Sequence, residues 1–118
     1  MNELDTTALD NIRALQRPGT PDMLARIIDI FLQETPAGIE QIQQSVAEGD
    51  LETVRTTAHS IKSSAAYLGA SSFSARMAEL ESAARETQLS HCQDLCLNLE
   101  QDCASVIDSL LELKDQAA

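Results

Sequence analysis

His59 is surrounded by residue types that suit the transfer of a charged group through an imidazole ring. Lys62 and Ser63 follow it by one helical turn, and Arg55 and Thr56 precede it by one. An imidazole, whose unperturbed pKa is ~6.5, has a free lone pair at neutral pH and can act as a nucleophile without a separate base. The Lys62 ammonium could partly neutralise a phosphoryl group placed on the ring. His59 is therefore a candidate phosphoacceptor, and Lys62 a candidate phosphate-neutralising residue.

A surface histidine without a function would explain the same spacing about as well. Two features favour a functional surface. Thr56, Ser63 and Ala66 lie on the same side of the predicted helix and are small, so the backbone of another molecule could approach closely. Arg55 and Lys62 form a local basic pair, which is an exception in an acidic chain with 19 acidic and 8 basic residues. Spacing alone leaves both interpretations open.

A helix over residues 51–68 is expected to position His59. Its apolar residues recur at steps of three and four, which predicts one buried side. With a turn of ~100° per residue, His59 lies roughly 130° from the centre of that side and is predicted to be exposed. Gly49 and Asp50 are predicted to end the preceding helix and cap this one, and Gly69 to end it. The buried side consists of Leu51, Val54, Ala58, Ile61, Ala65 and Leu68.

Two helices are predicted before the histidine helix. A short one runs from about Thr7 to Gln16, and residues 17–19 (Arg-Pro-Gly) end it. A long one follows the start signal Thr20-Pro21-Asp22 and continues to Gly49. Pro36 interrupts it, but the apolar phase continues across the proline, so one bent helix is favoured over two. Its inward side is predicted to comprise Leu24, Ile27, Ile28, Phe31, Thr35, Gly38, Ile39, Ile42 and Val46.

Two further helices are predicted after it. Ser71 and Ser72 offer caps for the first, whose inward residues are Phe73, Met77, Leu80 and Ala84. Residues 86–89 are predicted to be a loop. Ser90 and Gln93 have the spacing of a capping box, so the last helix is expected to begin there and continue unbroken. Its apolar seam has heptad spacing: Cys92, Cys96, Leu99, Cys103, Val106, Leu110 and Leu113.

Short loops between long helices predict antiparallel neighbours. The expected fold is all-α: an antiparallel up-down-up-down four-helix bundle with a short additional N-terminal helix, forming a single domain over residues 1–118. The composition agrees, because 43% of the residues are hydrophobic, only 3% are aromatic, and the chain has four glycines and three prolines. A hydrophobic core with few aromatic residues, in a chain with few glycines and prolines, favours helix packing over a turn-rich β fold.

Other chemistries have less support. The cysteines fall on the apolar seam, where small buried residues belong, so no metal site is predicted around His91 and Cys92. Glu79 and Glu81 are expected to be solvated surface residues. No glycine-rich loop could hold a nucleotide. The net charge of −11 argues against nucleic acid and anionic membranes. With no apolar run of ~18 residues, no signal peptide and three cysteines, the expected location is the cytoplasm.

Residues 58–70, which include His59, Lys62, Ser63 and Gly69, resemble the signature of histidine-containing phosphotransfer (HPt) domains. That signature is His-x-[Leu/Ile]-Lys-[Gly/Ser]-Ser, with a Leu/Val-Gly pair at the helix end. Flanking segments resemble the family too, and they cover nearly the whole chain: Phe-Leu-x-x-x-Pro at 31–36, Gly-Asp at 49–50 and the Leu-Glu helix at 77–81. Ser63 stands where glycine is commoner, and Tyr67 where a small polar residue such as Asn is common.

The resemblance implies a protein of a multistep two-component phosphorelay. His59 would carry a phosphoryl group between aspartates of receiver domains, which belong to response regulators or hybrid sensor histidine kinases. The chain would hold no cofactor, because the Mg²⁺ used in transfer belongs to the receiver. It would be a monomeric phosphoryl carrier rather than an enzyme, since it has no ATP-binding module. The residues expected to contact the partner are Arg55, Thr56, Ser63, Ala66, Tyr67 and Gly69.

Two alternatives stay open. One is a helical adaptor that binds a partner through the same face with His59 unmodified. The other is a histidine-kinase dimerisation domain, which usually has Glu or Asp after its histidine, where this chain has Ser60. Such domains also build their bundle from two chains, whereas this chain has enough long helices to close one alone.

Overall fold

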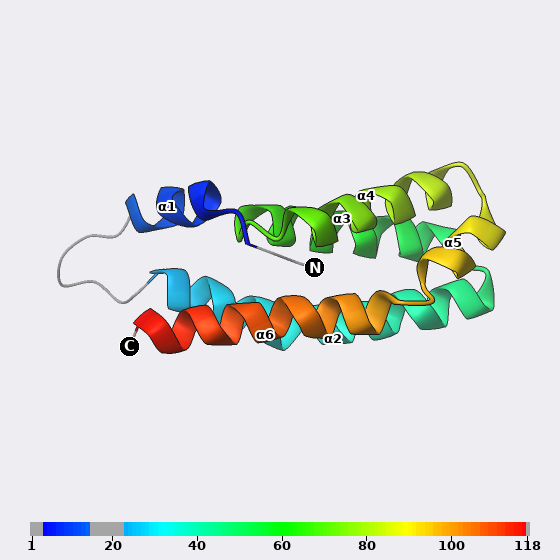
Figure 1. Ribbon diagram of the computed structural model, residues 1–118. Coiled ribbons are helices and arrows are strands. Elements are labelled where there is room, and N and C mark those ends of the chain that lie inside the picture. The colour runs from blue at the N-terminus through cyan, green and yellow to red at the C-terminus, as the bar shows by residue number, and fades with distance from the viewer. Residues whose placement is uncertain (1–3, 15–22, 118) are drawn as a thin grey trace.

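The structure is a computed structural model that describes residues 4–14 and 23–117. Within these residues it contains helices and no strand. Four long helices alternate in direction, with α3 and α4 in one layer and α2 and α6 in the other (Figure 1). The all-α bundle with a short N-terminal helix is therefore confirmed. The helices are α1 (Thr6–Ala14), α2 (Met23–Glu48), α3 (Leu51–Tyr67), α4 (Ser71–Arg85), α5 (Leu89–Leu95) and α6 (Leu99–Ala117).

The buried side of α3 is the one predicted from its apolar spacing. Leu51 is half-buried at the start of the helix, and the next five apolar residues of the stripe are fully buried. Each buried side chain removes apolar surface from water, which stabilises the fold by about 25 cal/mol for each Å² buried. Because this side faces the core, α3 turns its opposite side, with His59, away from the bundle. The buried residues are Val54, Ala58, Ile61, Ala65 and Leu68.

Pro36 lies inside α2, which continues without interruption from Met23 to Glu48. The prediction of one helix across Pro36, rather than two separate helices, is thus confirmed. Gly38, two residues further on, lies close to α3: a Cβ placed there would come within 2.9 Å of the Ile61 Cδ1 atom. The absence of a side chain at Gly38 therefore allows α2 to pack closely against α3, the helix that carries His59.

Both ends of α3 follow the expected turn chemistry. Gly49 has φ +76° and Gly69 has φ +79°, a left-handed conformation that glycine adopts at little cost. Asp50 caps α3, because its Oδ1 atom accepts a hydrogen bond from the Thr53 backbone N–H at 3.2 Å. The carbonyl of Gly69 accepts a hydrogen bond from the Asp5 N–H at 2.6 Å, which anchors the chain just before α1.

The predicted caps of α4 and α5 are wrong. Ala70 and Gln88 occupy the N-cap positions, and neither makes a side-chain capping hydrogen bond. Ser71 is already the first helical residue of α4, and Ser90 is the second of α5. Ser90 therefore stands inside the first turn, where it cannot act as the predicted cap.

The predicted unbroken last helix is also wrong, because residues 96–98 form a turn between α5 and α6. Hydrogen bonds there span three residues, from the Leu97 N–H to the Asp94 carbonyl and from the Leu99 N–H to the Cys96 carbonyl. The turn leaves Leu97 79% exposed. Leu95 takes the buried place assigned to Cys96, which is half-buried.

Beyond this turn the predicted seam of α6 is buried at Leu99, Cys103, Val106 and Leu110. The predicted end of the first helix at residues 16–19 and the Thr20-Pro21-Asp22 start signal lie outside the described residues. None of the helices in the described part of the chain is long and apolar enough to span a membrane.

Candidate functional site

His59 lies near the middle of α3, on the side away from the core, and its side chain is 59% exposed. Its predicted exposure is confirmed. The side chains of the α3 stripe hold the helix in the bundle, so the ring position is set by a rigid element rather than by a loop. His59 can therefore be reached by another molecule while its backbone is held by the core.

A buried carboxylate contacts the ring from the neighbouring helix. Glu81 of α4 is 5% exposed, and its Oε2 atom lies 2.8 Å from the His59 Nδ1 atom. Its other oxygen, Oε1, accepts a hydrogen bond from the Lys62 ammonium, also at 2.8 Å. The Arg85 guanidinium donates to Oε2 at 3.1 Å. One carboxylate thus joins His59 to two cationic side chains.

This contact determines which nitrogen of the ring holds the proton. The hydrogen bond from Lys62, aided by that from His59, lowers the pKa of Glu81 against the opposing effect of burial. At neutral pH Glu81 is therefore ionised, and an ionised carboxylate only accepts hydrogen bonds. The Nδ1 atom of His59 must then be the donor, and a neutral ring carries its lone pair on Nε2. The geometry provides an oriented nucleophile at Nε2.

Lys62 was predicted to neutralise a phosphate, and the structure places its ammonium on Glu81 beside the ring. The side chain is half-buried, and the Lys62 backbone carbonyl accepts a hydrogen bond from the Ser74 hydroxyl of α4 at 3.0 Å. An ammonium has three donor hydrogens, so Lys62 can hold Glu81 and still contact an anion on the ring. Its proposed role is compatible with this position.

The expectation that Glu81 is a solvated surface residue is wrong, and so its part in the site was missed. A signal was present in the sequence. Glu81 follows Met77 by four residues and precedes Ala84 by three, which places it at the edge of the buried side of α4. At ~100° per residue it lies about 70° from the centre of that side, whereas Glu79 lies on the exposed side. Arg85, one turn further along α4, was missed with it.

The other predicted contact residues of α3 are mostly accessible. Thr56, Ser63 and Ala66 are exposed. The hydroxyls of Thr56 and Ser63 donate to backbone carbonyls of α3, so they add little bulk beyond the helix surface. Arg55 pairs with Glu52, and this contact lowers the pKa of Glu52 and raises that of Arg55. The exposed face of α3 therefore combines a flat strip of small residues, Thr56, Ser63 and Ala66, with basic groups on the side that faces α4.

Gly69 differs from the other predicted contact residues because it is buried. A Cβ at Gly69 would come within 2.5 Å of the Asp5 carbonyl oxygen. The structure therefore contradicts the prediction that Gly69 contacts a partner directly. Gly69 therefore has a structural role: it allows the segment before α1 to pack closely against the turn that ends α3.

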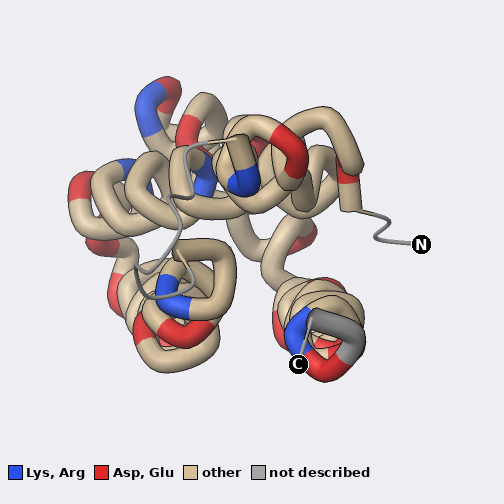
Figure 2. The backbone as a smooth tube through the Cα atoms, turned by 90° about the vertical axis from the view of Figure 1, so that its left-hand side faces the viewer, with Lys and Arg blue, Asp and Glu red and all other residues tan. Residues whose placement is uncertain are grey.

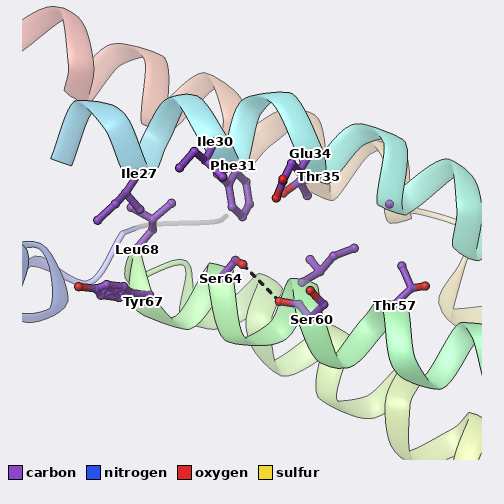
Figure 3. A pocket seen from close by; sticks show the side chains of 12 residues that line it. Ile27, Ile30, Phe31, Glu34, Thr35, Thr57, Ser60, Ser64, Tyr67 and Leu68 are labelled. Carbon is purple, nitrogen blue, oxygen red and sulfur yellow. Dashed lines mark hydrogen bonds between the residues drawn. The ribbon is translucent and has the colours of Figure 1, made fainter. Parts of the chain in front are cut away.

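On its other side, the strip borders an apolar groove of about 240 Å³ between α2 and α3 (Figure 3). Phe31 points into it from α2, and Ser60 and Ser64 form part of the α3 wall (Figure 3). Ile30 is 51% exposed and Tyr67 is 43% exposed, so both add accessible apolar surface beside the groove. Tyr67 therefore lies where a partner covering the groove would contact it. The remaining lining residues are Ile27, Glu34, Thr35, Gly38, Thr57, Ile61 and Leu68.

Among the described residues, no group of three or more His, Cys, Asp and Glu side chains could hold a metal ion. Cys92 and Cys103 are buried. Burial raises the pKa of all three thiols, that of Cys103 to about 11. His91 is exposed at the start of α5.

The sequence and the fold of this chain are similar to those of known proteins. The family model of the Hpt domain matches residues 26–115. A solved structure, histidine-containing phosphotransfer protein B (HptB) from Pseudomonas aeruginosa PAO1, is similar with a TM-score of 0.86 and 23% sequence identity, over 96% of this chain and 95% of that chain. No match is found among curated proteins. The family match spans most of the bundle and includes His59, Lys62 and Glu81, and the chain therefore belongs to the Hpt domain family, whose members carry phosphoryl groups on histidine in phosphorelays.

Proposed function

We propose that this protein accepts a phosphoryl group on the Nε2 atom of His59 from an aspartyl phosphate of one receiver domain and passes it to an aspartate of another. The observation that carries the proposal is the pairing of an exposed ring with a buried carboxylate that holds Nδ1. That contact leaves Nε2 as the nucleophile. The family match supports histidine phosphotransfer as the general chemistry.

The receiver docks on the exposed strip of α3 and on the groove beside it. Ile30 and Tyr67 supply apolar surface on one side of the strip, and Arg55 and Lys62 supply positive charge on the other. A receiver presents carboxylates around its phosphorylated aspartate, so positive charge beside His59 favours the encounter. Thr56, Ser63 and Ala66 lie between the two and allow close approach.

This chain supplies the phosphoacceptor, and its partners supply the metal ion and the second reacting group. The receiver brings the Mg²⁺, and the chain acts as a monomeric carrier in the cytoplasm rather than as a kinase. His59 and Lys62 are its reacting and phosphate-neutralising residues, and Glu81 is a positioning residue. Hybrid sensor kinases and response regulators are the expected sources and acceptors.

The test is incubation of the purified protein with a phosphorylated receiver and Mg²⁺. Acid-labile, base-stable phosphate is expected on the wild type and none on His59→Gln, because an amide is not a nucleophile here. The melting temperature of this variant is expected to stay within about 2 °C of the wild type, since an exposed residue contributes little to stability. His91→Gln is the matched control and should be labelled like the wild type.

Binding of receivers without labelling would contradict phosphotransfer and favour the helical adaptor. Labelling of His59→Gln would place the phosphoacceptor elsewhere.

A further inference from the structure

The contact between His59 and Glu81 has a consequence for both directions of transfer. We propose that Glu81 retains the Nδ1 proton of His59 throughout the phosphorylation cycle, so that phosphoryl groups enter and leave without any proton exchange with solvent. The inference rests on the proposed function and goes beyond it, because it assigns the protonation state of the phosphorylated ring.

The steps balance without a moving proton. In acceptance, the Nε2 lone pair forms a bond to phosphorus, and the bond from phosphorus to the aspartyl oxygen breaks with its electron pair going to that carboxylate. The ring now carries phosphorus on Nε2 and hydrogen on Nδ1, so it is a cation. In donation, an aspartate oxygen attacks phosphorus and the P–Nε2 electron pair returns to the ring. The leaving group is a neutral imidazole, which still has its Nδ1 hydrogen.

Loss of the Nδ1 proton would block this return. The leaving group would then be an imidazolate anion, which is far more basic and leaves more slowly. A carboxylate at 2.8 Å from Nδ1 opposes that loss, because it stabilises the cationic ring through a charge-assisted hydrogen bond. Glu81 is buried, so water competes little for this contact.

The other charges facing the ring act more weakly on the proton. Lys62 of α3 is bonded to the far oxygen of Glu81 and lies beside the phosphoryl group it would neutralise. Arg85 of α4 shares Oε2 at 3.1 Å, but its side chain is 61% exposed and its charge is screened by water. Arg55 of α3 is paired with Glu52. The direct contact with Glu81 therefore dominates.

The experiment compares the wild type, Glu81→Gln and Glu79→Gln. Each is phosphorylated with the small donor phosphoramidate, purified, and mixed with one receiver and Mg²⁺ between about pH 6 and pH 9. Dividing each variant's transfer rate by the wild-type rate cancels the receiver's own pH dependence. Glu79 is an exposed carboxylate on the same helix, so its variant controls for the loss of one negative charge.

The ratio for Glu81→Gln is expected to fall with rising pH, approaching about tenfold per pH unit once its phosphorylated ring loses the proton. The ratio for Glu79→Gln should stay flat. A merely structural role for Glu81 would lower the rate equally at all pH values, and a constant ratio would overturn the inference. A phosphorylated wild type that passes no phosphate to the receiver at any pH would instead contradict the proposed function.

A second measurement needs no variant. Nitrogen-15 NMR of the phosphorylated wild type should show hydrogen on Nδ1 of His59 at pH 8. A deprotonated Nδ1 at that pH would overturn the inference even if Glu81→Gln failed to fold.

Discussion

Glu81 shows how one buried side chain can serve both the site and the fold. It links α4 to α3 through Lys62 and His59, and a buried charge is tolerated only when it is paired in this way. Periodicity places Glu81 at the edge of the buried side of its helix. It does not say that His59, 22 residues earlier, lies opposite. That pairing depends on the relative register of two helices, which no local pattern encodes.

The lowered pKa of Glu81 predicts that the free energy of unfolding decreases at acidic pH. A carboxyl whose pKa is lower in the folded state than its ordinary value of 4.5 stabilises the fold above that value. The stabilisation is lost as the pH falls through the lower, folded pKa. Between about pH 5 and pH 3 the wild type should therefore lose more free energy of unfolding than Glu81→Gln, as measured by urea denaturation. Equal losses would mean that Glu81 is not preferentially ionised in the folded state.

At the scale of the helices, the two left-handed glycines offer a matched comparison. Gly49 and Gly69 have nearly the same φ, but a Cβ at Gly49 meets nothing within 4 Å, whereas one at Gly69 meets Asp5. Gly49→Ala should cost about 1 kcal/mol from backbone strain alone. Gly69→Ala should cost roughly 1–3 kcal/mol more, because the segment before α1 must move.

Chemical denaturation of both variants measures this difference. Hydrogen exchange at the Asp5 amide, which is bonded to Gly69, should quicken in Gly69→Ala and not in Gly49→Ala. Equal stability losses would show that the contact with Asp5 contributes nothing.

The helices themselves were largely predictable, and for a physical reason. The stripe of α3, the phase of α2 across Pro36 and the Asp50 cap depend on residues close in sequence. The break at residues 96–98 was not predictable, since Leu95, Cys96 and Leu97 are all apolar and each could continue an apolar seam. Packing at the end of the bundle decides between them: Leu95 is buried there and Leu97 is left exposed.

At the scale of the whole molecule, charge is divided between the two layers. Helices α3 and α4 carry four basic and three acidic side chains, whereas α2 and α6 carry two basic and nine acidic ones. In the end view of Figure 2 blue and red positions are mixed among the upper helices, whereas the lower two helices carry mostly red ones. The layer that contains His59 is therefore the one that an acidic partner can approach with least repulsion.

This division predicts a salt dependence of phosphoryl transfer from a receiver. Raising the ionic strength from about 0.05 to 0.5 M should slow the second-order rate severalfold, because screening weakens the attraction between basic side chains and the receiver. Arg55→Gln should reduce the dependence, as measured by stopped-flow transfer. Lys114→Gln is the control, since Lys114 is similarly exposed and also paired but lies on α6. Equal effects of both variants would contradict a steering role for the α3–α4 layer.

The cysteines of the last two helices have a consequence for redox chemistry. A thiol reacts with oxidants as its thiolate, and the raised pKa values leave little thiolate at neutral pH, least of all for Cys103. Cys92 and Cys103 are also buried among the core residues. While the bundle is folded, its three cysteine thiols should therefore react slowly with peroxide.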